Sequence, residues 1–194
     1  MTRQTHCAII FNEEKAAALL RDKPTGHGGY MAKKTKAEHC ASAYDTALRF
    51  LTPKARTVRE VETKLDEGNY SEGEIMQTIE RLQDAGLLDD EKYCRDFIES
   101  RLATKPVSKY RLREQLRGHF VPEDIIEAEL ASLPDDTEFN NAVEVASKYL
   151  RQFDAIEDET EKLRRVYTRL QTRGYSHETI MKALRAAAEQ NEEE

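Results

Sequence analysis

The chain has 194 residues, of which 39% are hydrophobic and 35% are charged, and its formal net charge is -7. With only 8 Gly, 5 Pro and no Trp, the composition argues against a β-sandwich or barrel, which needs many turns. It favours helices with one buried and one solvated face. The three cysteines form no CxxC pair, and no apolar run reaches the roughly 18 residues of a membrane span. We therefore expect a cytoplasmic protein with reduced thiols.

Residues 1–40 are predicted to be a separate, mobile extension. They hold 7 basic and 4 acidic side chains and include the turn-rich stretch 23–29. Met31 opens a second sequence that is typical of a protein start, so Met31 is a candidate initiator. Two His-Cys dipeptides, beginning at His6 and His39, could together supply four zinc ligands. Their spacing matches no familiar zinc finger, and no metal is predicted.

From residue 41 onward, one pattern recurs three times at intervals of about fifty residues, a period that is typical of helical repeat proteins. Each copy is anchored by a leucine, and the three anchors are Leu65, Leu116 and Leu170. A glycine and an aromatic residue follow each anchor, namely Gly68 and Tyr70, Gly118 and Phe120, and Gly174 and Tyr175. A single unit of this kind cannot bury its apolar face alone, so we expect the copies to stack.

Each copy is predicted to contain three helices. In chain order, these cover 41–52, 57–67 and 72–85, then 90–104, 108–117 and 122–132, then 137–153, 159–172 and 176–189. The glycine after each second helix is predicted to be a left-handed cap, and the aromatic residue to staple the third helix. The third copy has six additional residues, which are predicted to extend the loop at 153–158.

The predicted fold is therefore all-α, with three tandem three-helix repeats that form an elongated, curved array after a flexible N-terminal segment. The predicted boundaries are 1–40 for the extension, 41–88, 89–134 and 135–189 for the three repeats, and 190–194 for an acidic tail.

Short motifs that mark common enzyme sites are missing from the chain. There is no Walker loop, no GxGxxG, no GxSxG and no HExxH, and each of these motifs has a definite catalytic or phosphate-binding mechanism. No nucleophile, base or metal cluster converges in the sequence. We therefore expect a binding protein without catalytic residues or cofactors.

Basic side chains gather in two of the second helices. Six basic residues and one acid lie between residues 101 and 117, and five basic residues and no acid lie between residues 162 and 173. Stacked repeats would bring these helices to one side, which favours a surface for an acidic partner or for phosphates. The alternative is a solvated face that balances nearby acids. The predicted contact residues are Arg101, Lys105, Lys109, Arg111, Arg113, Arg117, Lys162, Arg165, Arg169 and Arg173.

The second repeat carries residues that resemble a known family. The run 86–93 reads GLLDDEKY, Phe97 and Ser100-Arg101 follow it, and residues 112–120 read LREQLRGHF. Together with the threefold repeat, these residues resemble the RecX regulatory proteins, which are bacterial modulators of the RecA recombinase. The resemblance covers residues 41–187.

The resemblance implies a protein without enzymatic activity that binds in the groove of the RecA–DNA filament. It would modulate the ATPase and strand-exchange activity of RecA, with inhibition favoured, in recombination, DNA repair and the SOS response. We expect a monomer without membrane association. Two alternatives stay open, namely direct binding of single- or double-stranded DNA, and a role as adaptor for another protein. Steeply salt-dependent binding to naked DNA would indicate the first, and a pull-down that lacks RecA would indicate the second.

Overall fold

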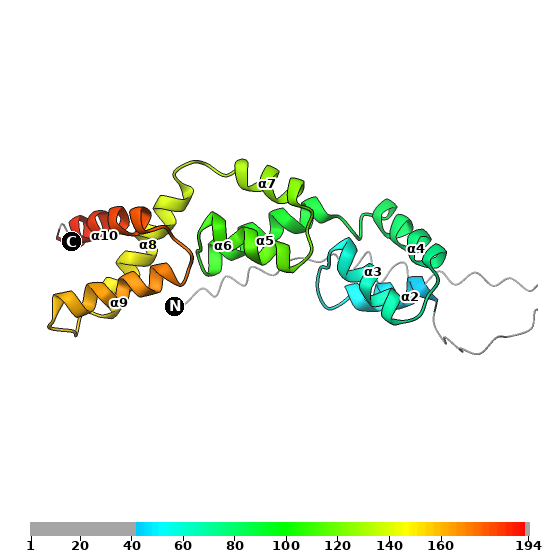
Figure 1. Ribbon diagram of the computed structural model, residues 1–194, viewed down its shortest axis with the longest axis horizontal. Helices are drawn as coiled ribbons and strands as arrows, with labels where there is room; N and C mark the ends of the chain where they lie inside the picture. Colours follow the sequence, from blue (N-terminus) through cyan, green and yellow to red (C-terminus); the bar gives the residue numbers. More distant parts are fainter. Residues whose placement is uncertain (1–41, 193–194) are drawn as a thin grey trace, which may run out of the picture. The chain divides into compact units, whose positions relative to one another are not determined.

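The computed structural model describes residues 42–192, which are drawn as a coloured ribbon in Figure 1. The predictions for the extension, for Met31 and for the His-Cys dipeptides lie outside these residues. The described elements are α2 (Ala43–Leu51), α3 (Val58–Glu67), α4 (Glu72–Asp84), α5 (Asp90–Thr104), α6 (Lys109–Gly118), α7 (Glu123–Ala131), α8 (Thr137–Gln152), α9 (Glu159–Gln171) and α10 (His177–Glu192).

Every element in this part of the chain is a helix, which confirms the all-α prediction with three helices in each repeat. The helix ends differ from the predicted ones by at most three residues. None of the helices between residues 42 and 192 has the length and apolar character that crossing a membrane requires.

The chain divides into two compact units, the first ending at Tyr93 and the second beginning at Cys94. This division falls inside α5. The first unit therefore contains α2, α3, α4 and the start of α5, and the second contains the rest of α5 and α6 to α10. The repeat boundaries at 88/89 and 134/135 stay a prediction.

In the first unit, α2, α3 and α4 enclose one apolar core. Leu48 and Leu51 from α2, Val61 and Leu65 from α3, and Leu82 from α4 are almost completely buried in it. Removing such side chains from water is the main force that holds short helices together.

The helices of the first unit begin at residues that cap their free amides. Ser42, Thr57 and Ser71 each accept a hydrogen bond from the backbone three residues later, which is how a polar side chain caps a helix start. At Ser71 the bond is reciprocated by Glu74, so α4 begins with a capping box.

In the second unit, α8, α9 and α10 surround a separate core. Small residues of α8 and α10, such as Ala146 and Ala183, are fully buried and allow the two helices to approach closely, while α9 adds Val166 and Leu170. The segment α5 to α7 buries apolar residues of its own, which are Cys94, Ile98, Val107, Leu112, Leu116, Val121, Ile126 and Leu130.

All three repeats have the same hydrogen-bond pattern where the second helix ends. The carbonyl of the buried anchor leucine accepts a bond from the amide five residues later, and the residue before that amide has a positive φ, as in a Schellman cap. The three pairs are Tyr70 N to Leu65 O at 3.3 Å, Val121 N to Leu116 O at 3.2 Å and Tyr175 N to Leu170 O at 3.4 Å.

The left-handed residue of this cap is a glycine only in the third repeat, where Gly174 has φ 85°. In the first two repeats the position is taken by Asn69 (φ 57°) and Phe120 (φ 59°). Gly68 has a right-handed backbone and Gly118 is the last residue of α6. The prediction of a left-handed glycine in every repeat is therefore wrong for the first and second repeats.

The same hydrogen bonds shift the alignment of the second repeat by one residue. Val121, rather than Phe120, is equivalent to Tyr70 and Tyr175. Val121 is buried, whereas Phe120 is 59% exposed. The predicted staple by Phe120 is wrong, because the left-handed backbone at this residue turns the ring toward solvent.

The third repeat is longer mainly because its second helix is longer. The N-cap and the anchor are 12 residues apart in this repeat (170 − 158) and 8 apart in the others (65 − 57 and 116 − 108). Four of the six additional residues thus add about one turn to α9, and the other two lie between Leu150 of α8 and the N-cap Asp158. The prediction that all six extend the loop is wrong.

Candidate partner-binding surface

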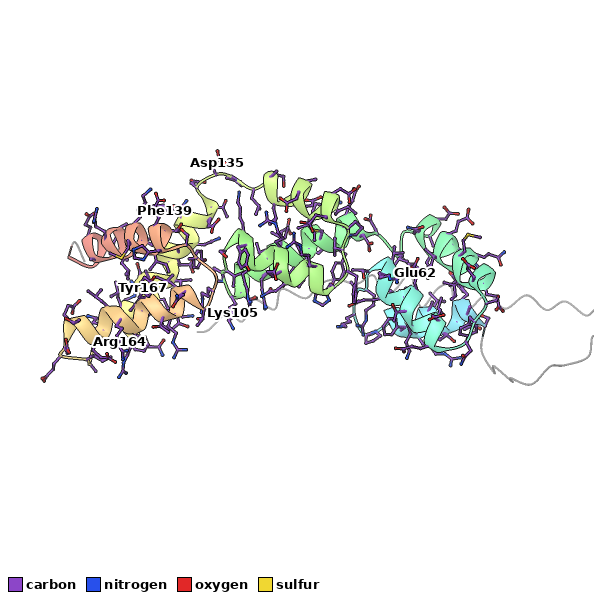
Figure 2. All side chains as sticks on the ribbon, viewed as in Figure 1. Glu62, Lys105, Asp135, Phe139, Arg164 and Tyr167 are labelled. Carbon is purple, nitrogen blue, oxygen red and sulfur yellow. The ribbon has the colours of Figure 1, made fainter. Side chains whose placement is uncertain are left out.

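All ten predicted contact residues lie in the second unit. Arg101 is in α5 and Lys105 follows that helix, four of the others are in α6, and the remaining four are in α9 or in the turn after it. Figure 2 labels Lys105 at the α5–α6 connection and Arg164 on α9. The structure places the ten side chains in different environments.

The start of α6 is bonded to the turn that follows α9. The Ser108 side chain caps α6 by accepting a hydrogen bond from Arg111 N at 3.1 Å, and Ser108 N donates to Arg173 O at 3.1 Å. Gly174 packs on this contact so closely that an added Cβ would lie 2.7 Å from Ser108 Oγ. The basic N-terminal end of α6 and the basic C-terminal end of α9 are therefore held next to each other.

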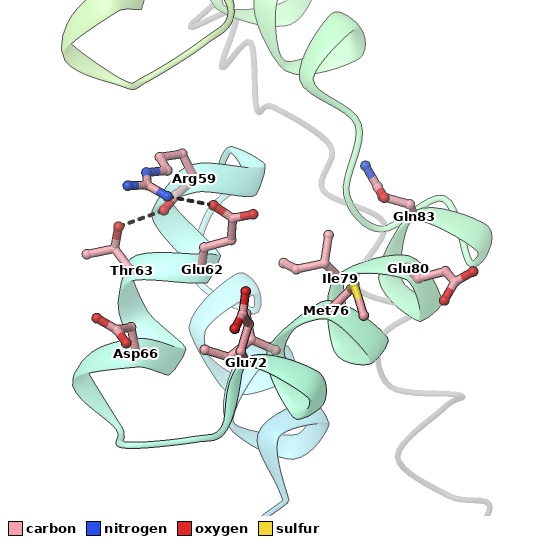
Figure 3. Close-up of a pocket in the computed structure, with 10 residues that line it drawn as sticks. Arg59, Glu62, Thr63, Asp66, Glu72, Met76, Ile79, Glu80 and Gln83 are labelled. Atoms are coloured by element: carbon pink, nitrogen blue, oxygen red, sulfur yellow. Dashed lines mark hydrogen bonds and ion pairs between the residues drawn. The ribbon is translucent and has the colours of Figure 1, made fainter.

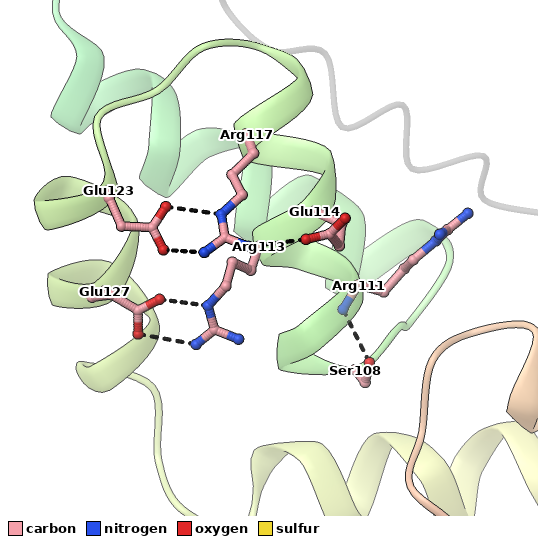
Figure 4. A network of polar contacts seen from close by, with 7 residues as sticks. All are labelled: Ser108, Arg111, Arg113, Glu114, Arg117, Glu123 and Glu127. Atoms are coloured by element: carbon pink, nitrogen blue, oxygen red, sulfur yellow. Dashed lines mark hydrogen bonds and ion pairs between the residues drawn. The ribbon is translucent and has the colours of Figure 1, made fainter.

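Arg113 and Arg117 are both paired with acids of α7 (Figure 4). Arg113 makes a two-point contact with Glu127, in which its Nη2 donates at 2.9 Å, and Arg117 makes a two-point contact with Glu123, in which its Nε donates at 2.9 Å. Arg117 also donates to Glu114 at 3.0 Å. These bonds lower the pKa of Glu127 and Glu123. Two-point pairs are the stronger ion pairs, so a partner would have to displace α7 carboxylates to reach either guanidinium.

Arg101 and Lys162 are also engaged within the chain. Arg101 Nε donates to the Gln115 side chain at 2.8 Å. Lys162 lies in the additional turn of α9, where Nζ pairs with Asp154 at 3.3 Å and Glu159 at 3.8 Å, and its side chain is only 15% exposed. Lys162 therefore contributes little free positive charge to the surface, whereas Arg101 keeps its charge because the Gln115 amide is neutral.

Along α9, a shallow groove of about 470 Å³ is lined by Arg164, Arg165 and Arg169, with one acid, Glu161. Arg164 and Arg165 both bond to Glu161, at 2.7 Å and 2.8 Å, and this lowers the pKa of Glu161 to about 2. One carboxylate cannot neutralise three guanidinium groups, so the groove keeps a net positive charge. Arg164 was not among the predicted contacts, because it lies off the stripe that the other α9 cations form.

Tyr149 of α8 holds the two arginines at the end of α9. Arg173 Nη2 donates to the Tyr149 hydroxyl at 3.1 Å, and the Arg173 and Arg169 guanidinium groups lie 5.3 Å and 5.7 Å from the centre of the ring. An aromatic face attracts cations without neutralising them. No sequence pattern marks Tyr149 as part of the surface, because an aromatic residue at helical spacing is indistinguishable from a core residue.

Lys105, Lys109 and Arg111 make no ion pair with any residue in the 42–192 range. They flank the N-terminus of α6 together with Tyr110, whose side chain is 59% exposed. Figure 4 shows Arg111 extending away from the Arg113 and Arg117 pairs. The unpaired cations of the candidate surface are therefore concentrated at this end of α6, beside the end of α9.

Comparison with known proteins gives the family. Models of the first, second and third three-helix domains of RecX match residues 43–82, 89–130 and 136–184. Regulatory protein RecX of Chlorobium phaeobacteroides (strain BS1) is 30% identical over 143 residues, which are 73% of this chain and 91% of that protein. This chain belongs to the RecX family. Regulatory protein RecX of Mycobacterium marinum is 33% identical over 129 residues, which are 66% of this chain and 75% of that RecX protein.

Solved RecX structures have the same fold. The crystal structure of RecX from Lactobacillus salivarius superposes with a TM-score of 0.65 and 23% identity, over 75% of this chain and 94% of that one. A second crystal structure of a RecX regulatory protein gives a TM-score of 0.62 and 20% identity, over 88% of this chain and 86% of that one.

Proposed function

We propose that this RecX-family protein binds the RecA recombinase filament and lowers its ATPase and strand-exchange activity in recombination and DNA repair. It would act without catalysis, as a monomer in the cytoplasm. Membership in a family of regulatory proteins supports a binding role. The basic surface of the second unit supports a partner that carries negative charge, and a protein–DNA filament has this property.

The proposed contact centres on the cations that no carboxylate neutralises. Lys105, Lys109 and Arg111 have no ion pair among residues 42–192, and Arg169 is held by an aromatic ring rather than an acid. Arg165 adds to the positive groove on α9. Arg101, Arg113, Arg117, Lys162 and Arg173 would support this contact from the edge, because each already makes a hydrogen bond or an ion pair within the second unit.

The decisive experiment measures RecA ATPase and strand exchange on single-stranded DNA with sub-stoichiometric amounts of the full chain. We expect both activities to fall. The variant Lys105→Glu with Arg111→Glu should weaken the effect at least about tenfold, since unpaired charges at an interface steer association and fix its register. The absence of any effect of the unmodified protein, at any ratio to RecA, would overturn the proposal.

A matched control is the variant Lys148→Glu with Arg185→Glu. These two exposed residues lie on α8 and α10 and make no ion pair among the described residues. The control changes the net charge by the same amount as Lys105→Glu with Arg111→Glu. We expect the control to keep most of the effect on RecA. An equal loss in both variants would mean that overall charge, rather than the α6 end, determines binding.

A second candidate function is direct binding of single-stranded DNA, which the exposed Tyr110 ring between Lys109 and Arg111 favours. Aromatic side chains beside cations are the usual platform on which bases stack. Binding to an oligonucleotide without RecA should then weaken with salt by about 0.7 in log K per neutralised phosphate for each unit of log salt. Tyr110→Ala should reduce that binding, and an unmodified chain that binds no oligonucleotide at low salt would exclude this function.

A further inference from the structure

The first unit carries a second surface, whose charge is opposite to that of the basic candidate surface on α6 and α9. A groove of about 920 Å³ lies between α3 and α4, and Figure 3 shows it with its lining residues. The lining consists of Arg59, Glu62, Thr63, Asp66, Glu72, Ile75, Met76, Ile79, Glu80 and Gln83.

The apolar part of the groove comes from one side of α4. Ile79 lies four residues after Ile75 and three after Met76, so the three side chains lie along the same face of α4 over more than one turn. Ile79 is buried in the core of the unit, whereas Met76 is 69% exposed. Met76 therefore contributes little to the core, and an exposed, flexible methionine is a common feature of surfaces that bind other chains.

Acidic side chains border this apolar strip on both helices. Glu62 and Asp66 lie one turn apart on α3, and Glu72 and Glu80 lie on α4. Arg59 neutralises Glu62 through an ion pair of 3.0 Å. The other three carboxylates make no ion pair within residues 42–192, so the groove has a net negative charge.

We propose that this groove binds an amphipathic helix with a basic face from a partner protein. Such a helix would place apolar residues on Ile75 and Met76 and cations against Asp66, Glu72 and Glu80, in the helix-in-groove mode of recognition. An extended peptide has no strand edge to join among the described residues. Nucleic acid is repelled by the same carboxylates. The surface is independent of the proposed contact with RecA, which uses the second unit.

The first test measures peptide binding to the full chain by fluorescence anisotropy. The probe is a synthetic helix-forming peptide with leucines along one face and lysines on both flanks, and the control peptide has glutamate in place of every lysine. We expect the basic peptide to bind and to bind less tightly as salt increases, because exposed charges are screened. Binding of both peptides with equal affinity, or of neither, would overturn the proposal.

The second test uses variants of the groove. Asp66→Lys with Glu80→Lys should weaken binding of the basic peptide at least about tenfold, because two attractions become repulsions. Asp66 is in the last turn of α3, where a lysine favours the helix, so the variant should fold, and circular dichroism would verify this. Met76→Gln keeps the charge and should also weaken binding.

The matched control is Glu99→Lys with Glu189→Lys, two exposed acids on α5 and α10 that lie outside the groove. We expect it to bind the basic peptide as the unmodified chain does. An equal loss in the control would overturn the assignment to the groove. Sedimentation would also overturn it by showing a dimer that Asp66→Lys with Glu80→Lys dissociates, since the occupant would then be a second copy of the chain.

Discussion

Gly174 has no room for a side chain. Its φ is 85°, and an added Cβ would lie 2.7 Å from Ser108 Oγ and 3.1 Å from Arg111 Cβ. We expect Gly174→Ala to lower the free energy of unfolding by about 2 kcal/mol, because strain at a positive φ adds to the clash. Urea denaturation would measure this. Gly118 is the control, since it is helical with open space around it, and Gly118→Ala should be neutral or stabilising by up to about 1 kcal/mol.

Phe120 has the same left-handed backbone without being a glycine. A left-handed conformation costs a residue with a Cβ about 1–2 kcal/mol. We therefore predict that Phe120→Gly is more stable than Phe120→Ala by about 1 kcal/mol, although both variants lose the exposed ring. Equal midpoints of the two variants in urea would show that the backbone at this position is not strained.

The anchor leucines could be identified from the sequence, whereas the register of the second repeat could not. Leu116 occupies the same position in the helical pattern as Leu65 and Leu170, and a buried position requires an apolar residue. Residue type alone favours Phe120 over the adjacent Val121 at the aromatic position. In the structure it is the amide of Val121 that bonds to the carbonyl of Leu116. Any residue except proline can donate such a backbone bond, so the type of residue does not reveal it.

At the scale of the helix, a hydrogen bond to a carboxylate joins the start of α5 to the start of α3. Asp90 Oδ1 accepts a hydrogen bond from Val58 N at 2.9 Å. Burial raises the pKa of Asp90, and Asp89, Glu62 and Glu60 raise it further, against the lowering effect of the Val58 bond. The charged form of Asp90 is thus less favourable in the folded chain than in the unfolded one.

We predict that Asp90→Asn stabilises the chain at neutral pH, because an amide oxygen keeps the bond to Val58 without the charge. A raised carboxyl pKa means that stability falls as pH rises from below 3.8 through the folded pKa of this group. The additional stability of Asp90→Asn over the unmodified chain should therefore disappear below pH 3.8, where Asp90 is protonated in the folded and the unfolded chain. Urea titrations of both proteins across acidic pH would measure it, and a constant difference would contradict the prediction.

Glu161 should show the opposite dependence of stability on pH, because the α9 arginines lower its pKa. Bonds from Arg164 and Arg165 lower its pKa from the ordinary value to about 2, so its contribution to stability is present above pH 4.5 and is lost as pH falls toward 2. A carboxyl titration by NMR at low salt should show this value. Replacing Arg164 and Arg165 by alanine should return it to near 4.5, and an unchanged titration would show that the pairs do not form in solution.

The positions of the cations were predictable, but their pairing was not. Arg113 and Arg117 are four residues apart on α6, so the helical repeat of 3.6 residues per turn places them on the same face. Their partners, Glu123 and Glu127, lie on the next helix. Which acid meets which arginine depends on how α6 and α7 pack and on side-chain rotamers, which spacing along one helix does not determine.

At the scale of the whole chain, the division inside α5 predicts that the two units respond separately. The Gly174→Ala change lies in the second unit, at the contact between Ser108 and Arg173. Hydrogen exchange should become faster at the start of α6 and around the α9–α10 turn. Amides of α2, α3 and α4 should keep their protection. Faster exchange in both units would mean that they unfold together.

The five-residue spacing between each anchor leucine and the amide that bonds to its carbonyl also limits how RecX sequences can diverge in length. A residue gained or lost inside this segment would break the Schellman cap and rotate the third helix away from the core. Length changes are tolerated just upstream, where the third repeat adds about one turn to α9 and two residues between Leu150 and the N-cap of that helix. Gaps in alignments of relatives should therefore fall between the first helix and the anchor of a repeat, and be absent between the anchor and the fifth residue after it.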